Sequence, residues 1–270
     1  MIDSSTIEIA VAIPVYNSHP FLERAVESVL AQTDSHWTLY LLDDGSTDPR
    51  IIRALENYSK HPKIRVKSHA NQGGLKTRNH LLNWVNEPWI AWLDHDDEMN
   101  PERIKRQREV LGSKPNLVAL GSWIEFIDED SKVIGRRRYP VTDQEVREAL
   151  PLINPIANPS VVLNVSVVKS LGGIVGHWGA DDYETLLLLA KKGRVENIPE
   201  FLTRYRLHTA QHKYTQTRDQ LRATINIKLQ MKKFGYPRGL KFWLRLTAEC
   251  ALMVLPQSFV SWLFKKLNGM

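Results

Sequence analysis

The chain has 270 residues, of which 43% are hydrophobic and 24% are charged. This length and composition are typical of a globular protein with a substantial core, and they exclude a disordered chain. The single cysteine, Cys250, excludes a disulfide framework and a metal site built from several cysteines, and it is typical of a reducing compartment. The first residues lack a basic region before their short apolar run, so we expect no signal peptide.

The net charge of +6 is unevenly distributed along the chain. Residues 201–270 contain 13 Lys and Arg against 2 Asp and Glu, an excess of +11, whereas residues 1–200 contain 23 against 28, or −5. An acidic body with a basic tail indicates a polyanion or an anionic membrane surface as the partner of the tail.

The first hundred residues alternate short apolar runs with amphipathic stretches. The predicted elements are strands at 9–13, 38–42, 64–68 and 89–93, alternating with helices at 21–32, 51–59 and 75–85. This order predicts an α/β fold with a Rossmann-like, mostly parallel sheet that carries helices on both faces. Ligands bind such sheets outside the carboxyl ends of the strands.

The remainder of the chain is less regular. The predicted elements there are a hairpin of strands at 117–127 and 133–137, a strand at 161–163, a helix at 182–192 and a strand at 201–206. From about Arg238 the pattern changes to two short amphipathic helices on either side of Pro256. The uncharged run from Cys250 to Phe264 has 15 residues, fewer than the roughly 20 that a membrane-spanning helix needs. The mixture of Trp, Phe and Lys across the two predicted helices favours a segment lying at a membrane surface, and packing on the domain or on a second subunit is the alternative.

Acidic residues gather directly after two of the predicted strands. Asp43 and Asp44 follow the second strand, and Asp94 and Asp96 follow the fourth. Like charges at one edge of a sheet repel each other, and a cation would relieve that repulsion. Mg²⁺ and Mn²⁺ prefer such oxygen ligands and commonly share them with substrate phosphates. A solvated turn or a helix cap is the alternative for each acidic pair.

Four sequence blocks resemble the nucleotide-binding half of the family 2 inverting glycosyltransferases of bacterial-type polysaccharide and glycolipid synthesis, which have the GT-A fold. The blocks stand in family order at family spacing within residues 9–108: VAIPVYNSHPFLERAVESVLAQT, LYLLDDGSTD, NQGGLKTRNHLL and IAWLDHDDEMNPERI. Residues 154–213 resemble the family more loosely. The resemblance implies a GT-A domain at 1–237, with a nucleotide-sugar-binding half at 1–110 and an acceptor-binding half at 111–237. Basic amphipathic helices would follow at 238–270.

The resemblance also implies a donor site. The positions matched to the nucleotide are Pro14, Val15, Tyr16, Asp43, Asp44, Arg78 and Asp94. Asp44 would contact the base. Asp94 and Asp96 match the family's Asp-x-Asp pair, which holds Mn²⁺ or Mg²⁺ on the diphosphate, with Asp96 as the direct ligand. His208 would be a third metal ligand or a phosphate contact, although a lone histidine is more often structural.

A later acidic pair, Asp181 and Asp182, matches the pair whose second member is the family's catalytic base. Asp181 stands where the family more commonly has Glu. An inverting transfer needs a carboxylate that takes the proton of the acceptor hydroxyl, and we assign this role to Asp182. The alternative is that Asp182 only caps a helix. Trp178 is placed to stack on a sugar ring, but tryptophan is also a common core residue.

The resemblance therefore implies a metal-dependent inverting glycosyltransferase of cell-surface polysaccharide synthesis. It would transfer a sugar from a nucleoside diphosphate sugar, most simply a UDP-sugar, to a glycan or a lipid-linked acceptor. A nucleotidyltransferase, or a non-catalytic nucleotide-sugar-binding protein of a glycan assembly complex, is the alternative. The aromatic residues of the tail stand at helical spacing, which argues against nucleic-acid binding. We expect a cytoplasmic protein held peripherally at the inner face of the plasma membrane.

Overall fold

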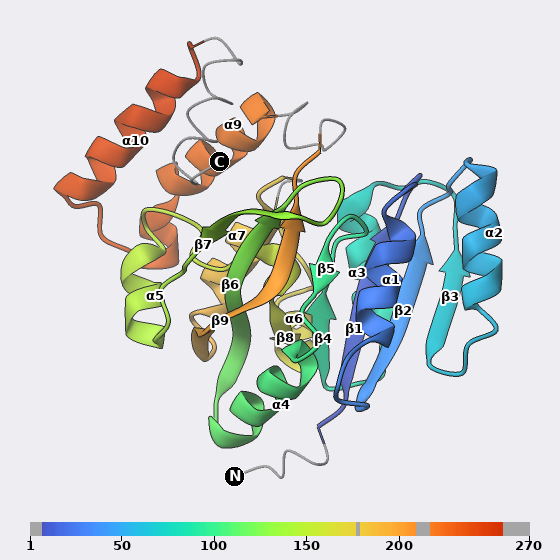
Figure 1. Ribbon diagram of the computed structural model, residues 1–270. Helices are drawn as coiled ribbons and strands as arrows, with labels where there is room; N and C mark the ends of the chain where they lie inside the picture. The colour runs from blue at the N-terminus through green and yellow to red at the C-terminus, as the bar shows by residue number, and fades with distance from the viewer. Residues whose placement is uncertain (1–6, 177–178, 209–216, 256–270) are drawn as a thin grey trace.

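The computed structural model describes residues 7–176, 179–208 and 217–255 (Figure 1). Its strands are β1 (Ile9–Val15), β2 (Trp37–Asp43), β3 (Ile64–Ser68), β4 (Trp89–Trp92), β5 (Glu98–Met99), β6 (Leu117–Ile127), β7 (Val133–Arg137), β8 (Val162–Asn164) and β9 (Arg194–Arg206). Its helices are α1 (Leu22–Leu30), α2 (Pro49–Tyr58), α3 (Gly74–Trp84), α4 (Arg103–Ser113), α5 (Asp143–Ala149), α6 (Val165–Ser170), α7 (Asp181–Leu189), α9 (Thr217–Leu229) and α10 (Leu240–Leu252), with 3₁₀ turns η2 (Asn158–Ser160) and η3 (Met231–Phe234). Within these residues the strands form one sheet in the order β3-β2-β1-β4-β8-β6-β9-β5, and β7 pairs with β6.

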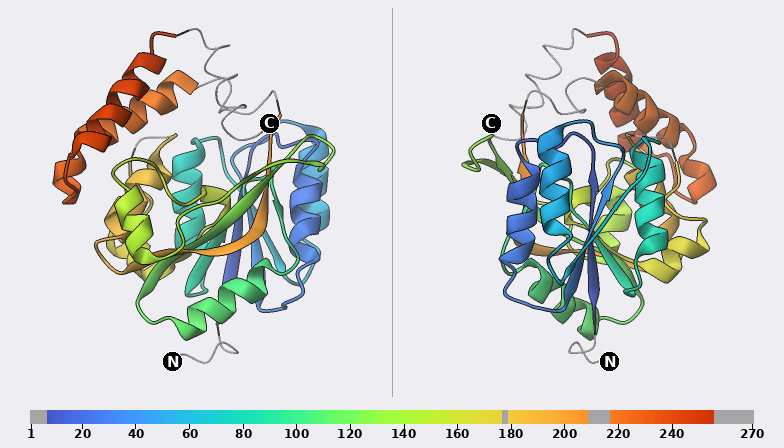
Figure 2. Two further views of the ribbon diagram at one scale, coloured as in Figure 1. Left: turned by 60° about the vertical axis from the view of Figure 1, so that its left-hand side comes forward. Right: turned by 90° about the vertical axis from the view of Figure 1, so that its right-hand side faces the viewer.

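The strand and helix alternation predicted for the first hundred residues is confirmed. Strand β1 pairs in parallel with β2 and β4, and β2 pairs in parallel with β3. Alternate residues of β1 enter two different cores: Ile9, Val11 and Ile13 pack with α1, α2 and α4, whereas the small residues Ala10 and Ala12 face α3, α6 and α7. Helices therefore cover both faces of the sheet (Figure 2), as in a GT-A fold.

The second half combines parallel and antiparallel pairs. Strand β8 lies antiparallel between β4 and β6, and β6 is parallel to β9. The predicted hairpin of β6 and β7 is confirmed. Strand β9 begins at Arg194, seven residues before the predicted start. The sequence pattern missed this part because Glu196 is charged, yet its side chain is buried and paired with Lys114 and Arg194.

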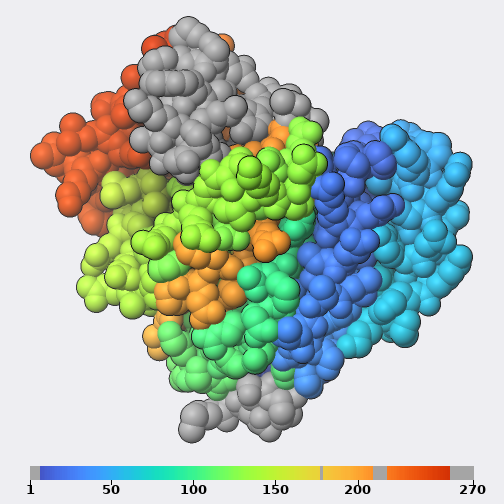
Figure 3. Space-filling model, in the orientation of Figure 1, coloured from blue at the N-terminus to red at the C-terminus, as the bar shows by residue number. Residues whose placement is uncertain are grey.

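The tail contributes two helices, α9 and α10, which lie side by side (Figures 1 and 2). Phe242 and Leu246 of α10 enter the core that contains α7. The opposite face is open, with Leu240 76% and Leu244 61% exposed, and the space-filling view shows α10 at one corner of the molecule (Figure 3). The helix expected after Pro256 lies outside the described residues, and the domain boundary at 237/238 stays a prediction. No helix in the described ranges is long and apolar enough to cross a membrane.

A buried ion pair fastens α10 to α9 and to the body. Lys228 of α9 is 1% exposed. Its Nζ donates to both carboxylate oxygens of Glu249 on α10, at 2.6 and 2.7 Å, and to the carbonyl oxygen of Leu152 at 2.6 Å. Burial lowers the pKa of Lys228, and the contact with Glu249 opposes that shift.

Replacing Glu249 by Ala should therefore lower the free energy of unfolding by about 3–5 kcal/mol, because it leaves a buried ammonium group without its counter-charge. Urea denaturation followed by circular dichroism measures this loss. Asp219→Ala is the matched control. It breaks the exposed ion pair between Asp219 and Arg222 on α9, the helix that also carries Lys228, and exposed ion pairs contribute little to stability. Equal stability of the Glu249 and Asp219 variants would contradict the structural role of the pair.

Candidate active site

An acidic group surrounds one arginine at the carboxyl end of β4. Arg78 lies on α3, Asp94 follows β4, and Asp181 begins α7. The Arg78 guanidinium donates to Asp181 Oδ2 at 2.9 Å and to Asp94 Oδ1 at 3.3 Å. The structure thus brings together three of the predicted site residues from segments 16 and 103 positions apart in the sequence. Burial raises the pKa of Asp94, although the charge of Arg78 opposes this.

Asp182 lies beside this group in the first turn of α7. Its Oδ2 accepts a hydrogen bond from Asn154 Nδ2 at 2.8 Å, and its Oδ1 accepts one from the backbone N–H of Tyr183 at 2.8 Å. Burial, and then the neighbouring charge of Asp181, raise the pKa of Asp182 to about 6. This carboxylate is therefore oriented and basic near neutral pH, which is the property a general base requires.

Asp181 has a different environment from its neighbour. Its side chain is 2% exposed and is held by Arg78 and by the backbone N–H of Gly179, at 3.2 Å. Such a buried, paired carboxylate positions Arg78 and the start of α7, so it is not open to an acceptor sugar. Trp178, expected to stack on a sugar, lies outside the described residues.

Asp96 and His208 meet because of strand pairing. Strands β5 and β9 are antiparallel, with Glu98 opposite Arg204, so the residues before β5 lie opposite the end of β9. His208 Nε2 lies 3.0 Å from Asp96 Oδ2. The imidazole also packs on the Phe21 ring, with centroids 4.8 Å apart. The predicted proximity of these two side chains is thus observed.

Arg206 holds the acidic loop in place, a role that we did not predict from the sequence. Its side chain is 0% exposed. Its Nε donates to the Asp96 carbonyl oxygen at 2.8 Å, its guanidinium also contacts Glu98, and its backbone N–H donates to Asp97 Oδ1 at 2.8 Å. The signal was weak, because one arginine in a strand resembles an exposed cross-strand residue.

The donor set at this loop fits Mg²⁺ or Mn²⁺. Burial, followed by the charges of Asp96 and Asp94, raises the pKa of Asp97 well above its usual range, and Asp97 Oδ2 has no hydrogen-bond partner among the described residues. Asp94 and Asp96 therefore make a further negative charge unfavourable in this loop, and a divalent cation would relieve that repulsion. Within the same described ranges, however, no three His, Cys, Asp or Glu side chains are grouped as a metal site. Asp94 turns towards Arg78, which leaves Asp96 and His208 as the adjacent pair.

The predicted nucleotide residues lie at the ends of β1 and β2. Asp44 is 4% exposed, and its two oxygens accept the backbone N–H groups of Gln72 and Gly73 at 2.7 and 3.0 Å. Asp43 similarly accepts the N–H of Ser46. Both carboxylates therefore fix loops at the end of the sheet.

The predicted loop of Pro14, Val15 and Tyr16 divides into buried and open side chains. Tyr16 is 45% exposed and is the most accessible of the three. Val15 is only 1% exposed and packs in the core, so its side chain does not line a nucleotide pocket, contrary to our prediction. Alternation along β1 explains this, since successive side chains point to opposite faces.

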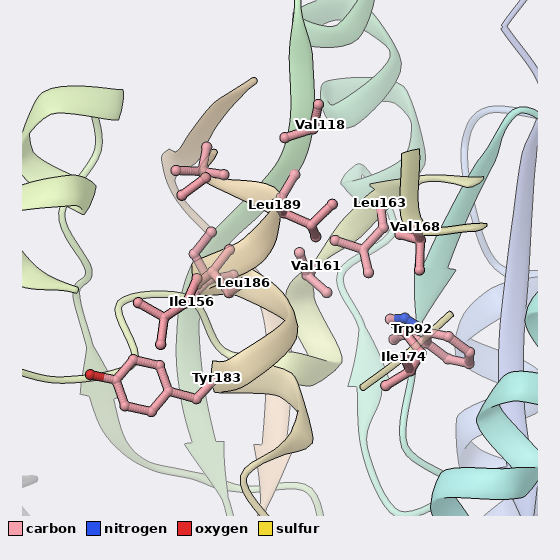
Figure 4. Close-up of a cluster of buried hydrophobic side chains, with 14 of the residues drawn as sticks. Trp92, Val118, Ile156, Val161, Leu163, Val168, Ile174, Tyr183, Leu186 and Leu189 are labelled. Atoms are coloured by element: carbon pink, nitrogen blue, oxygen red, sulfur yellow. The ribbon is translucent and has the colours of Figure 1, made fainter. Parts of the chain in front are cut away.

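A small pocket of about 30 Å³ extends from the acidic group into the core. Its polar rim is Arg78, Asp181, Asp182 and Asn154, and its apolar walls come mainly from β4, β8, α7 and the segments around Ile156 and Ile174. Figure 4 shows Ile156, Leu186 and Leu189 on one side of Val161 and Trp92 on the other.

The sequence from residue 10 to residue 168 matches the model of "Glycosyl transferase family 2". The chain belongs to glycosyl transferase family 2. This match covers all of β1 to β4 except Ile9 and includes Arg78, Asp94 and Asp96. The enzyme class expected from the sequence, a glycosyltransferase, is confirmed.

Several curated proteins are similar to this glycosyltransferase. The amylovoran biosynthesis glycosyltransferase AmsE of Erwinia amylovora is 25% identical over 264 residues, which cover 95% of this chain and 98% of that one. An uncharacterized glycosyltransferase of Haemophilus influenzae is 26% identical over 84% of this chain and 75% of its own length. The uncharacterized protein y4gI of Sinorhizobium fredii is 34% identical over 66% of this chain, but the match spans only 20% of that protein.

Solved structures confirm the GT-A fold. S. aureus TarS 1–349 in complex with UDP-GlcNAc matches with a TM-score of 0.65 and 17% identity over 83% of this chain and 67% of that one. The mannosyltransferase PcManGT from Pyrobaculum calidifontis, in complex with GDP-Man and Mn²⁺, matches with a TM-score of 0.66 and 14% identity over 100% of this chain and 78% of that one. At these identities the likeness concerns the fold alone.

Proposed function

We propose that this family 2 member is a metal-dependent, inverting glycosyltransferase that moves a sugar from a nucleoside diphosphate sugar to a glycan or a lipid-linked acceptor of a cell-surface polysaccharide. The observation that carries the proposal is the Asp182 carboxylate, whose pKa is raised to about 6 and which Asn154 and the Tyr183 N–H hold beside the Arg78 group. AmsE and the O-antigen biosynthesis glycosyltransferase WbnJ of Escherichia coli, which is 25% identical over 74% of this chain, support the polysaccharide assignment.

In the proposed reaction Asp182 accepts the proton of the acceptor hydroxyl as that oxygen attacks the anomeric carbon. Asn154 keeps the carboxylate aimed, and Asp181 holds Arg78 next to it. Asp96 and His208 would hold Mn²⁺ or Mg²⁺, and substrate phosphates would complete the coordination. Asp94 would lie next to the metal and contact the ribose. The bound cation supplies charge stabilisation to the departing diphosphate.

The donor nucleotide would lie over the ends of β1 and β2. Tyr16 offers an exposed ring there, and the loops fixed by Asp43 and Asp44 present backbone groups to the base. Asp44 Oδ1 also lies 3.4 Å from His69 Nδ1, so Oδ2 is the oxygen that keeps a lone pair for the base. The ligands named for TarS and PcManGT differ in their base. Binding of UDP, GDP and dTDP with and without MnCl₂, measured by calorimetry, identifies the nucleotide, and absence of binding by all three would refute the donor site.

The pKa of Asp182 predicts the acid limb of the activity profile. Below pH 6 this carboxylate becomes protonated and can no longer accept a proton. The rate should therefore fall as the pH is lowered, with a slope that approaches about tenfold per pH unit. Above pH 6 the rate should reach a plateau. Initial rates between pH 4.5 and 8.5, with circular dichroism as a check on folding, measure the profile. A rate that stays flat down to pH 4.5 would argue against Asp182 as the base.

The open face of α10 supports peripheral attachment to an anionic membrane. Leu240, Trp243 and Leu244 are 46–76% exposed, and Lys241 and Arg245 flank them on the same helix. Apolar and aromatic side chains bordered by basic ones are typical of helices that lie in the plane of a membrane surface. The apolar and basic character of this face thus fits a lipid-linked acceptor.

Serine at positions 240 and 244 should weaken binding to phosphatidylglycerol vesicles at least tenfold, since each buried leucine contributes about 1.5–3 kcal/mol. This double variant, Leu240→Ser with Leu244→Ser, keeps the Lys228–Glu249 pair, whereas truncation after Arg238 removes it. The control is Ile52→Ser with Val133→Ser, because both side chains are 41% exposed away from α10. Vesicle sedimentation is the readout, and a full-length chain that never sediments would refute the membrane proposal.

A further inference from the structure

The pocket beneath the acidic group has a form that the proposed reaction alone does not explain. Its rim is formed by Arg78, Asp181, Asp182 and Asn154, and it continues along α7 past Thr185 to Leu189. Below the rim the walls are almost entirely apolar, with Trp92 and Leu163 on the sheet side. The space of about 30 Å³ can hold a methyl group, and its apolar lining suits one.

Two polar side chains, Thr185 and Asn158, interrupt the apolar walls, and the Thr185 hydroxyl is already bonded to the backbone of Val175. Asn158, at the start of η2, lines the pocket. Its Nδ2 atom is buried and finds no hydrogen-bond acceptor in the described part of the chain. Buried donors are nearly always paired, so this amide indicates that a ligand oxygen accepts a hydrogen bond from it at this point of the pocket.

We propose that the pocket takes the acetamido group of an N-acetylated substrate sugar. The methyl group would fill the apolar end against Val161 and Ile156, and the carbonyl oxygen would accept the hydrogen bond from Asn158 Nδ2. A hydroxyl group at the same sugar carbon would leave the apolar space empty and would not reach Asn158. This inference rests on the proposed function, because the pocket opens beside Asp182, where the donor and acceptor sugars meet.

Calorimetric titration of the full-length protein with UDP-GlcNAc, UDP-glucose and UDP in MnCl₂ tests the donor as the source of this group. A buried methyl group and one hydrogen bond should make UDP-GlcNAc bind roughly tenfold more tightly than UDP-glucose. Asn158→Ala and the pocket-filling Val161→Leu should each reduce that ratio to within about threefold without changing the affinity for UDP. The matched controls are Asn86→Ala and Val133→Leu, at exposed positions, which should keep the wild-type ratio.

Saturation-transfer NMR with p-nitrophenyl N-acetyl-β-glucosaminide and p-nitrophenyl β-glucoside, with and without UDP, tests the acceptor as the source. The acetyl methyl protons should receive the strongest saturation, and Asn158→Ala should remove this preference. Preference for the acetamido compound in either experiment, lost in both pocket variants, supports the inference. Equal binding of acetamido and hydroxyl compounds in both experiments overturns it. Failure to bind any UDP compound counts against a UDP donor, and the NMR experiment without UDP then decides the role of the pocket.

Discussion

Replacing Asp182 by Asn should lower the rate of sugar transfer by about 10²- to 10⁴-fold, because the amide cannot accept the proton that a general base must take. Nucleotide affinity should stay within about twofold of the wild type, since no described contact joins Asp182 to the loops at Asp43, Asp44 and Tyr16. Transfer is measured by release of nucleoside diphosphate, and affinity by calorimetry on the same preparation.

Two controls make this result specific. Glu184→Gln changes the third acid in the first turn of α7 and should leave most activity, because Asp182 and not Glu184 is proposed as the base. Asp130→Asn changes an acid in the β6–β7 turn and should have no effect. If Glu184→Gln were the inactive variant and Asp182→Asn the active one, the assignment of the base would be wrong.

The Asp182→Asn variant should be at least as stable as the wild type at neutral pH. The folded protein raises the pKa of Asp182 from 3.8 to about 6, so it binds this proton more tightly than the unfolded chain does. The stability contributed by that proton is complete below pH 3.8 and is lost as the pH rises through 6. The amide introduced by Asp182→Asn carries no charge to be buried, so the variant should unfold at an equal or higher temperature at pH 7.5. A clearly lower melting temperature would mean that lost activity reports damage to the fold.

Replacing Asp96 by Ala should lower metal-supported turnover by about a hundredfold or more, because it removes the carboxylate that lies 3.0 Å from His208 in the acidic loop. His208→Ala should cost less, about 10- to 100-fold in metal affinity, as expected when one partner of a ligand pair is lost. Mn²⁺ binding followed by electron paramagnetic resonance gives the affinity, and titration of turnover with MnCl₂ gives the activity.

The control for these variants is Asp128→Asn, because the Asp128 side chain supports the neighbouring hairpin turn. This change should leave the Mn²⁺ affinity unaltered even if the turn is weakened. Wild-type turnover that persists in excess EDTA would contradict a metal-dependent reaction, and it would remove the role given to Asp96.

The elements of the nucleotide half could be predicted because their patterns are local. Strands β1, β2 and β4 are short, mainly apolar runs, β3 alternates apolar and polar residues, and α1 places Leu22, Ala25, Val26 and Val29 at helical spacing. The start of β9 could not be predicted in this way, because Glu196 is buried through ion pairs that include Lys114, which is distant in the sequence. Helix α5 was missed although it carries a local signal, the capping box formed by Thr142 and Glu145.

In the candidate site, too, residues in local motifs could be predicted and residues that act through distant contacts could not. Asp94, Asp96 and Asp182 were predictable because each carboxylate follows a strand or begins a helix in a recognisable motif. The residues that aim them were not: Asn154 and Arg206 act through contacts that span 28 and 110 positions of the chain. We also predicted from the sequence that Val15 contacts the nucleotide, although the alternation of side chains along β1 places the Val15 side chain in the core.

The configuration of the anomeric carbon in the product tests the central claim most directly. A single displacement, in which Asp182 deprotonates the acceptor and no enzyme-bound sugar forms, inverts that carbon. Proton NMR of the glycoside formed from an α-linked nucleotide sugar should therefore show the large coupling constant of a β-linked gluco-configured product. A product that retains the α configuration would contradict the account, because retention requires a different path from the one that Asp182 supports.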